Sequence, residues 1–213
     1  MTVAVIDYGS GNLHSAAKAL ERAARESGLN ETIEVTRDPE KVRRADRVVL
    51  PGVGAFADCK AGLVAVPGMI AAMTEAVRDK GRPFFGICVG MQLLADSSEE
   101  GSLPGLGYVS GRVRKIPEDI LSAPPKLPHL GWNSITQARE CPLLEGVDPK
   151  IGYYFLHSYY FDPTRPEDVL ATTVFGREIT CAVWHENVYG VQFHPEKSHA
   201  NGVRLLRNFA TMN

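Results

Sequence analysis

The chain has 213 residues, 44% of them hydrophobic and 23% charged, values typical of a folded globular protein with one α/β domain. Its 23 basic and 25 acidic side chains leave a net charge of −2, which gives no reason to expect a nucleic acid or an anionic membrane as partner. No apolar run approaches the roughly 20 residues of a membrane-spanning helix, and four cysteines without tight spacing favour a reducing cytoplasm. We therefore expect a single cytoplasmic domain over residues 1–213. No C-x-x-C pair is present, so no metal site is expected, and nothing in the chain requires a cofactor.

The first half of the chain alternates strand-like and helix-like segments. Val3–Ile6 is a continuous apolar run, typical of a strand buried on both faces, and turn-forming residues follow it. Apolar residues then recur at helical spacing up to about Gly28. Further strands are predicted around Ile33, at Val48–Leu50 and in the run that ends at Cys88. This alternation predicts an α/β fold with a doubly wound, mostly parallel central sheet flanked by helices.

The loop Pro51–Phe56 directly follows the third predicted strand. Ligands of doubly wound sheets bind at the carboxyl ends of the strands, so this loop falls in a binding position. Gly52 and Gly54 allow its backbone to turn an N–H toward a ligand, from Gly52, Val53 or Gly54. A simple glycine-rich turn is the alternative, and a phosphate loop is disfavoured because no G-K-[ST] ending is present.

The segment Phe84–Gln92 carries the strongest functional signal. A strand-like run enters a G-x-C-x-G turn centred on Cys88, and helix-forming residues follow, as in a nucleophile elbow. The glycines on either side of Cys88 remove Cβ atoms that would clash in so sharp a turn. The alternative is a small buried hydrophobic cysteine, which is what we expect of Cys59, Cys141 and Cys181. At Cys88 the pattern predicts a thiol nucleophile, with the N–H of Val89 as an oxyanion donor.

The second half of the chain is strand-rich with few helical stretches, which predicts an antiparallel C-terminal half. Strand-like segments lie at 108–116, 127–135, 153–161, 169–175 and 181–193, and a helix is predicted over 201–212. His194 and Glu196 follow the last strand two residues apart, so their side chains are expected on one face. The carboxylate could then orient the imidazole as the third member of a Cys88–His194–Glu196 triad.

His129 and His157 lie in aromatic-rich segments, His129–Asn133 and His157–Tyr160. They are either ordinary strand ends or groups that hold a substrate or face a partner. Their spacing does not decide between these two interpretations.

These motifs resemble the class I (triad) glutamine amidotransferases. The elbow Gly86–Gln92 and His194–Glu196 carry the general resemblance. Further segments narrow it to the family of glutaminase subunits of imidazole glycerol phosphate synthase; they are Asp7–Leu13, Pro51–Phe56, Pro128–Asn133, Phe155–Tyr159 and Gln192–Ser198. The resemblance extends from Ile6 to Phe209, although the segment 57–73 has no clear match.

The resemblance implies a mechanism and a partner. The Cys88 thiolate attacks the side-chain amide of glutamine, His194 protonates the leaving ammonia, and water hydrolyses the γ-glutamyl thioester. Gln92 and the backbone at Ser158 and Tyr159 are implied to bind glutamine. Ammonia is implied to pass to a cyclase subunit with a (β/α)8 barrel, which makes imidazole glycerol phosphate and aminoimidazole carboxamide ribotide in histidine biosynthesis. The loops of Asn12, Trp132 and Lys197 are implied to lie near that interface.

The resemblance also implies that the loop after Pro51 is poorly set for catalysis until the cyclase binds its ligand. Val89 replaces the usual leucine of the elbow, but its expected contribution is a backbone N–H. Three alternatives remain at this point: the glutaminase subunit of another amidotransferase, such as pyridoxal phosphate synthase; a thiol peptidase; and a non-catalytic binding subunit.

Overall fold

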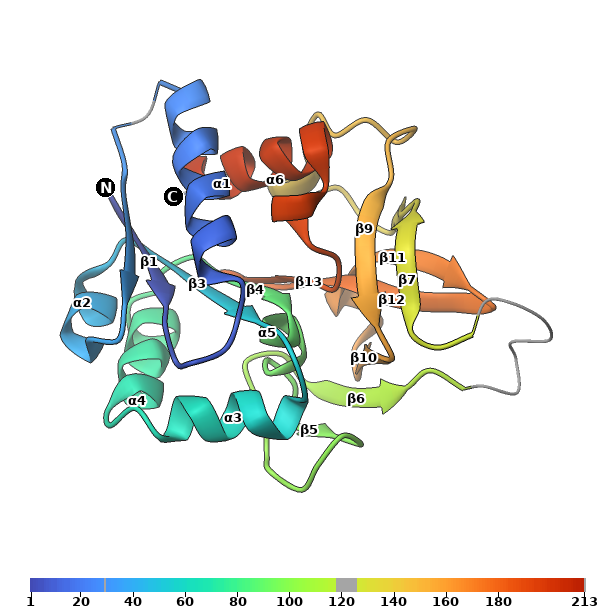
Figure 1. Ribbon diagram of the computed structural model, residues 1–213, viewed down its shortest axis with the longest axis horizontal. Helices are drawn as coiled ribbons and strands as arrows, with labels where there is room; N and C mark the ends of the chain where they lie inside the picture. The colour runs from blue at the N-terminus through green and yellow to red at the C-terminus, as the bar shows by residue number, and fades with distance from the viewer. Residues whose placement is uncertain (29, 118–125, 213) are drawn as a thin grey trace.

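The computed structural model describes residues 1–28, 30–117 and 126–212. Its centre is an eight-stranded sheet in the order β2-β1-β3-β4-β13-β12-β11-β8 (Figure 1). The strands of the parallel part are β1 (Thr2–Ile6), β2 (Thr32–Thr36), β3 (Arg47–Gly52), β4 (Phe84–Cys88) and β13 (Val188–Val191). The antiparallel strands are β12 (Arg177–His185), β11 (Val169–Phe175) and β8 (Thr136–Gln137).

Helices cover both faces of this sheet. In Figure 1, α1 (Leu13–Glu26) and α6 (His199–Thr211) lie above it, and α3 (Phe56–Val64) and α4 (Met69–Thr74) lie below it. The remaining helical segments are α2 (Pro39–Arg44), η1 (Glu75–Asp79), α5 (Val89–Gln92), η2 (Pro142–Leu144), η3 (Pro166–Asp168) and η4 (Pro195–Lys197). The apolar side of α1 is buried, as its helical spacing predicts.

Two small sheets complete the strand-rich half. One consists of β10 (Tyr159–Pro163), β6 (Gly111–Lys115) and β5 (Ser97–Ser98), and the other of β7 (His129–Asn133) and β9 (Tyr153–His157). The predicted fold class is confirmed: a mostly parallel sheet flanked by helices, with an antiparallel C-terminal half. The single strand expected over 153–161 is instead two strands, because the chain breaks at Ser158 and enters a different sheet.

The position of β13 determines the site. This strand pairs in parallel with β4, and Val191 lies opposite Ile87 in the register. Strand β13 therefore ends beside the elbow, and the residues that follow it emerge next to Cys88. Such a pairing brings together two segments that are far apart in the sequence at the carboxyl edge of the sheet.

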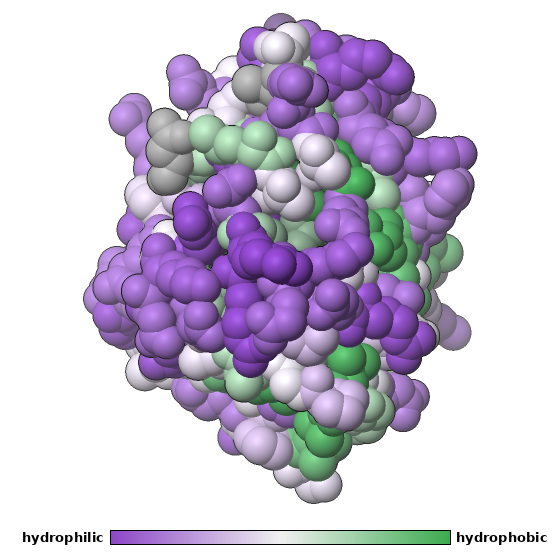
Figure 2. Space-filling model, turned by 90° about the vertical axis from the view of Figure 1, so that its left-hand side faces the viewer, coloured by the Kyte–Doolittle hydropathy of each residue, from purple (hydrophilic) through white to green (hydrophobic). Residues whose placement is uncertain are grey.

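The surface on the β2 side is mostly hydrophilic (Figure 2). Glu34 of β2 pairs with Lys41 of α2, and Arg43 pairs with Glu75, so charged groups protect this edge of the sheet. Within the described residues, no single helix is long and apolar enough to cross a membrane. The helical segments Phe56–Val64 and Met69–Asp79 reach the required length and composition only when they are counted as one, and a 96° bend separates them.

Candidate active site

The elbow is a strained turn between β4 and α5. Cys88 adopts φ 56° and ψ −115°, a conformation that costs a non-glycine residue about 1–3 kcal/mol and is typical of functional turns. A Cβ at Gly86 would lie 2.6 Å from the Gly90 carbonyl oxygen, and a Cβ at Gly90 would lie 1.8 Å from the Leu50 carbonyl oxygen. Close backbone approach therefore explains both glycines, as the sequence predicted. The helix after the turn is only four residues long, shorter than expected, so its dipole is weak.

His194 lies between Cys88 and Glu196. Its Nδ1 is 2.9 Å from Glu196 Oε1, and His194 and Cys88 line the same cavity. Both residues are buried, with 4% and 3% of their side chains exposed. Burial lowers the pKa of His194, but the hydrogen bonds and charges of Cys88 and Glu196 outweigh it and raise that pKa to about 10. The imidazolium is thus favoured, with Nδ1–H donating to Glu196 and Nε2 left for Cys88.

The backbone around this pair differs from the expected strand end. Glu196 belongs to the 3₁₀ turn η4, whereas His194 precedes that turn. The alternation of side chains along a strand therefore does not explain their contact. The turn brings the carboxylate back toward the imidazole, and the backbone N–H of His194 donates to the Tyr154 carbonyl at 2.9 Å, which holds the base in place.

The loop after β3 lies beside the nucleophile. Gly52 is packed so tightly that a Cβ would lie 2.7 Å from the Gly90 nitrogen. The Val53 carbonyl accepts hydrogen bonds from Ser10 Oγ at 2.6 Å and Cys59 Sγ at 3.3 Å, and the Val53 N–H donates to Ser10 Oγ at 3.4 Å. Val53 therefore offers no free N–H to the cavity in this state. Val89 begins α5, where an N–H has no partner within the helix.

A cavity of about 330 Å³ opens at the carboxyl edge of the sheet beside Cys88. It brings together most of the residues predicted for the site. Its lining is Val53, Gly54, Cys88, Val89, Gln92, Glu100, Pro128, Leu156, His157, Ser158, Tyr159, His194 and Lys197. Asn12, Gly52, Trp132 and Glu196 are not among them, although Glu196 contacts the lining residue His194. The arrangement suits a small substrate with one end at the thiol and the other against Ser158 and Tyr159.

Gln192 is a site residue that the sequence analysis did not single out. It is fully buried directly after β13, its Nε2 lies 3.7 Å from Cys88 Sγ, and its Oε1 accepts from Gln92 Nε2 at 3.0 Å. A glutamine two residues before His194, in the segment Gln192–Glu196, was the available signal. Its position depends on the pairing of β13 with β4, which the local pattern does not reveal.

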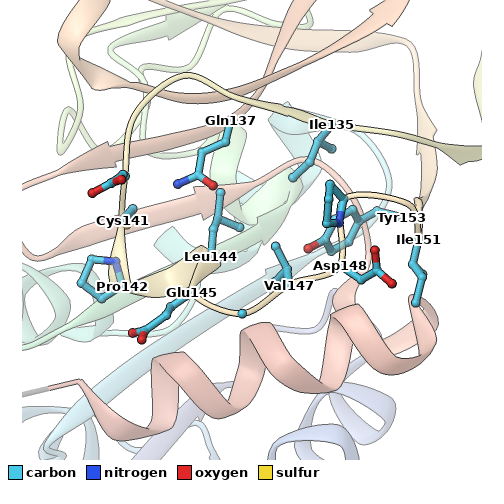
Figure 3. A pocket seen from close by; sticks show the side chains of 13 residues that line it. Ile135, Gln137, Cys141, Pro142, Leu144, Glu145, Val147, Asp148, Ile151 and Tyr153 are labelled. Carbon is cyan, nitrogen blue, oxygen red and sulfur yellow. The ribbon is translucent and has the colours of Figure 1, made fainter.

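A larger cavity, of about 690 Å³, lies elsewhere, in the segment 135–153 (Figure 3). Cys141 lines this cavity, but no histidine does. Burial raises the pKa of the Cys141 thiol. Burial also raises the thiol pKa of Cys59 and Cys181, in agreement with the expectation that these cysteines are packing residues. The cavity beside Cys88 is lined by both a cysteine and a histidine, Cys88 and His194. No group of three His, Cys, Asp or Glu side chains among the described residues could hold a metal ion.

Comparison with known proteins identifies the family. The model of the glutamine amidotransferase class-I family matches residues 4–212. The chain is 55% identical to imidazole glycerol phosphate synthase subunit HisH of Rhodospirillum rubrum and 53% identical to that of Rhodopseudomonas palustris, over 98% of both chains in each case. Among solved structures, a glutamine amidotransferase aligns with a TM-score of 0.68 at 21% identity, over 97% of this chain and 96% of that one. A glutamine amidotransferase of Thermotoga maritima aligns with 0.61 at 20% identity, over 92% and 76%.

Proposed function

The chain belongs to the class I glutamine amidotransferases, and within them to the HisH subunits of imidazole glycerol phosphate synthase, and from this membership we propose that it is the glutaminase that supplies ammonia for histidine biosynthesis. The observations that support this most directly are that Cys88 and His194 line one cavity and that Glu196 hydrogen-bonds the His194 ring at 2.9 Å. A thiol, a base and an orienting carboxylate in that order are what acyl transfer to sulfur requires.

In the proposed mechanism, the Cys88 thiolate adds to the carboxamide carbon of glutamine. The resulting oxyanion is stabilised by the N–H of Val89 and by a second N–H from the loop Gly52–Gly54, each worth about 2.7–4 kcal/mol. His194 gives its proton to the departing nitrogen, so ammonia leaves and a γ-glutamyl thioester remains. His194 then removes a proton from water, which attacks the thioester and releases glutamate and the thiol.

The loop geometry supports a partner-dependent activity. Ser10 engages both the carbonyl and the N–H of Val53, so the Val53 N–H is not available as an oxyanion donor in this state. A rearrangement of Val53 would complete the oxyanion hole. We attribute that rearrangement to the docking of the cyclase subunit with its ligand bound, which also prevents glutamine from being wasted.

We place the surface on which the proposed partner docks, the docking face, on one side of the β7–β9 sheet. Leu130 and Leu156 are cross-strand neighbours on this side, and with Trp132 they are 61%, 42% and 49% exposed. Large apolar side chains gathered on an exposed surface typically mark an interface. Lys197 and Asn12 are the other two residues that we propose for the interface. Lys197 lines the cavity, and its ammonium is 5.4 Å from the Tyr154 ring centre. Asn12 directly precedes α1. A (β/α)8-barrel cyclase is the proposed partner, and ammonia passes to it without release into the cytoplasm.

The test mixes the chain with the cyclase subunit and its phosphoribulosyl ligand and follows glutamate release from glutamine. We expect a ligand-dependent rate that Cys88→Ala lowers by about 10⁴-fold or more, with Cys141→Ala as the matched control that retains it. Mass spectrometry should detect a γ-glutamyl adduct at Cys88. Full activity of Cys88→Ala, or hydrolysis of peptides in preference to glutamine, would refute the proposal.

A further inference from the structure

His129 and His157 form a buried pair behind the docking face. They lie opposite each other on β7 and β9, and His129 Nδ1 is 2.9 Å from His157 Nε2. Each ring has a second partner: His129 Nε2 lies 3.2 Å from Asn133 Nδ2, and His157 Nδ1 lies 2.7 Å from the Tyr159 carbonyl oxygen. Every ring nitrogen of this pair is therefore engaged, and neither imidazole bonds to the triad.

The Tyr159 carbonyl, which accepts, and the Asn133 amide, which donates, determine the direction of every hydrogen bond. The Tyr159 carbonyl can only accept, so His157 must carry its proton on Nδ1, which leaves Nε2 as an acceptor. His129 must then donate from Nδ1, and its Nε2 accepts from the Asn133 amide, which also donates to the Val174 carbonyl at 2.9 Å. Both rings are thus neutral Nδ1–H tautomers.

The surroundings keep both rings neutral and in place. His129 stacks between Phe155 and Phe175, with ring centres 4.6 and 4.2 Å away. Burial lowers the pKa of His129 to about 4 and, despite its bond to the Tyr159 carbonyl, that of His157 to about 3.

The same Tyr159 carbonyl is shared with the catalytic cavity. Gln92 Nε2 donates to it at 3.2 Å and donates its second hydrogen to Gln192 Oε1 at 3.0 Å. Because both N–H groups of Gln92 are engaged, its Oε1 is the atom left to accept a hydrogen bond from a molecule in the cavity. Gln192 Nε2 continues the chain to Cys88 Sγ.

We propose that His129 and His157 are positioning residues that hold the Tyr159 carbonyl in place, so that the Gln92 amide keeps its oxygen toward the α-ammonium group of glutamine. This inference rests on the proposed glutaminase function. Without the His157 bond the Tyr159 carbonyl keeps only the 3.2 Å bond from Gln92. The Gln92 amide can then rotate, and its NH₂ group would repel that ammonium. The consequence is weaker binding of glutamine with an unchanged rate of the chemical step.

Two substitutions of His157 separate this role from simple packing. Asparagine places an N–H where Nδ1 lies and retains the bond to Tyr159, whereas glutamine places an oxygen where Nε2 lies and retains only the bond to His129. In the complex with the cyclase subunit and its ligand, we expect His157→Gln to raise the KM for glutamine about tenfold, equivalent to one hydrogen bond, with kcat within about twofold of the wild type. His157→Asn should leave both constants within about twofold.

The outcomes distinguish this inference from the proposed function. A wild-type complex that releases no glutamate refutes the proposed function. An active wild type in which His157→Gln has an unchanged KM, or in which both variants raise it equally, refutes the positioning role alone. Imidazole ¹⁵N NMR provides a readout independent of activity: two neutral Nδ1–H rings are expected in the wild type, and Nε2–H rings would contradict the chain of bonds even if a variant failed to fold.

Discussion

Ser10 hydrogen-bonds the loop Gly52–Gly54, for which we propose an oxyanion role. Its hydroxyl contacts the carbonyl and the N–H of Val53, and Cys59 adds a weaker bond to the same carbonyl. These contacts hold a donor away from the cavity beside Cys88. The low activity expected of the isolated chain therefore has a specific physical cause at one side chain.

We predict that Ser10→Ala raises the glutaminase rate of the isolated chain. Loss of a net hydrogen-bond contribution of about 1 kcal/mol should shift the loop toward the catalytic conformation by roughly fivefold, and the basal kcat by a similar factor. Glutamate release without partner measures it, with Ser15→Ala on α1 as the control. An unchanged or lower basal rate for Ser10→Ala would show that Ser10 does not restrain the loop.

The buried histidine pair makes stability depend on pH. Both pKa values in the folded state, about 4 and about 3, lie below the ordinary value of 6.5, so the unfolded chain binds protons that the folded chain does not. Above pH 6.5 both imidazoles are mostly neutral in the folded and in the unfolded chain. As pH falls below 6.5, the unfolded chain binds protons that the folded chain does not, so the free energy of unfolding decreases.

Between pH 7 and pH 5 we expect the two imidazoles together to lower the free energy of unfolding by about 4 kcal/mol. Urea unfolding at several pH values measures this slope. Replacing both His129 and His157 with glutamine should flatten it, whereas His14→Asn on the exposed side of α1 should not. An equally steep slope in the double variant would place the titrating groups elsewhere.

At the scale of elements, the elbow depends on the contact between β3 and α5. The Gly90 Cα lies so close to the Leu50 carbonyl that a methyl group would overlap it at 1.8 Å. We predict that Gly90→Ala lowers the free energy of unfolding by more than about 3 kcal/mol, because backbone must move. The control is Gly81→Ala, where φ is +61° but the space is open, and the cost should be about 1 kcal/mol. Equal costs for both variants, measured by urea unfolding, would contradict the close approach.

The elements also show how far the sequence leads. The strand–elbow–helix pattern around Cys88 is local, so period and glycine spacing were enough to predict it. The contact of His194 with Glu196 was predicted correctly but for the wrong reason, since a 3₁₀ turn and not a strand brings them together. Gln192 and the His129–His157 pair depend on which strands become neighbours, and that is decided by packing across the molecule.

At the scale of the whole molecule, Arg47 joins segments from both ends of the chain. Its guanidinium, 2% exposed, lies 3.0 Å from Glu31 Oε1 and donates to the Met212 carbonyl through Nε at 2.8 Å. This places the start of β3, the loop before β2 and the end of α6 in one buried polar cluster. Glu31 Oε2 is buried and has no hydrogen-bond partner among the described residues.

We predict that Arg47→Met lowers the free energy of unfolding by about 3–5 kcal/mol, because it leaves the Glu31 charge buried without a partner. Arg22→Met, which breaks the exposed pair with Glu26, should cost less than about 1 kcal/mol. The double variant Arg47→Met with Glu31→Leu should recover much of the loss. Urea unfolding distinguishes these outcomes, and a small effect of Arg47→Met would mean that water reaches Glu31.

The parallel pairing of β13 with β4 has a consequence while the chain is being synthesised on the ribosome. The thiol of residue 88 leaves the ribosome well before the imidazole of residue 194, by roughly 5–20 seconds at about 5–20 residues per second. Throughout that interval the nascent chain has the proposed nucleophile without its proposed base. Because β13 lies between β4 and β12, His194 comes next to Cys88 only once this pairing has formed, and we expect a chain that lacks the pairing to hydrolyse no glutamine.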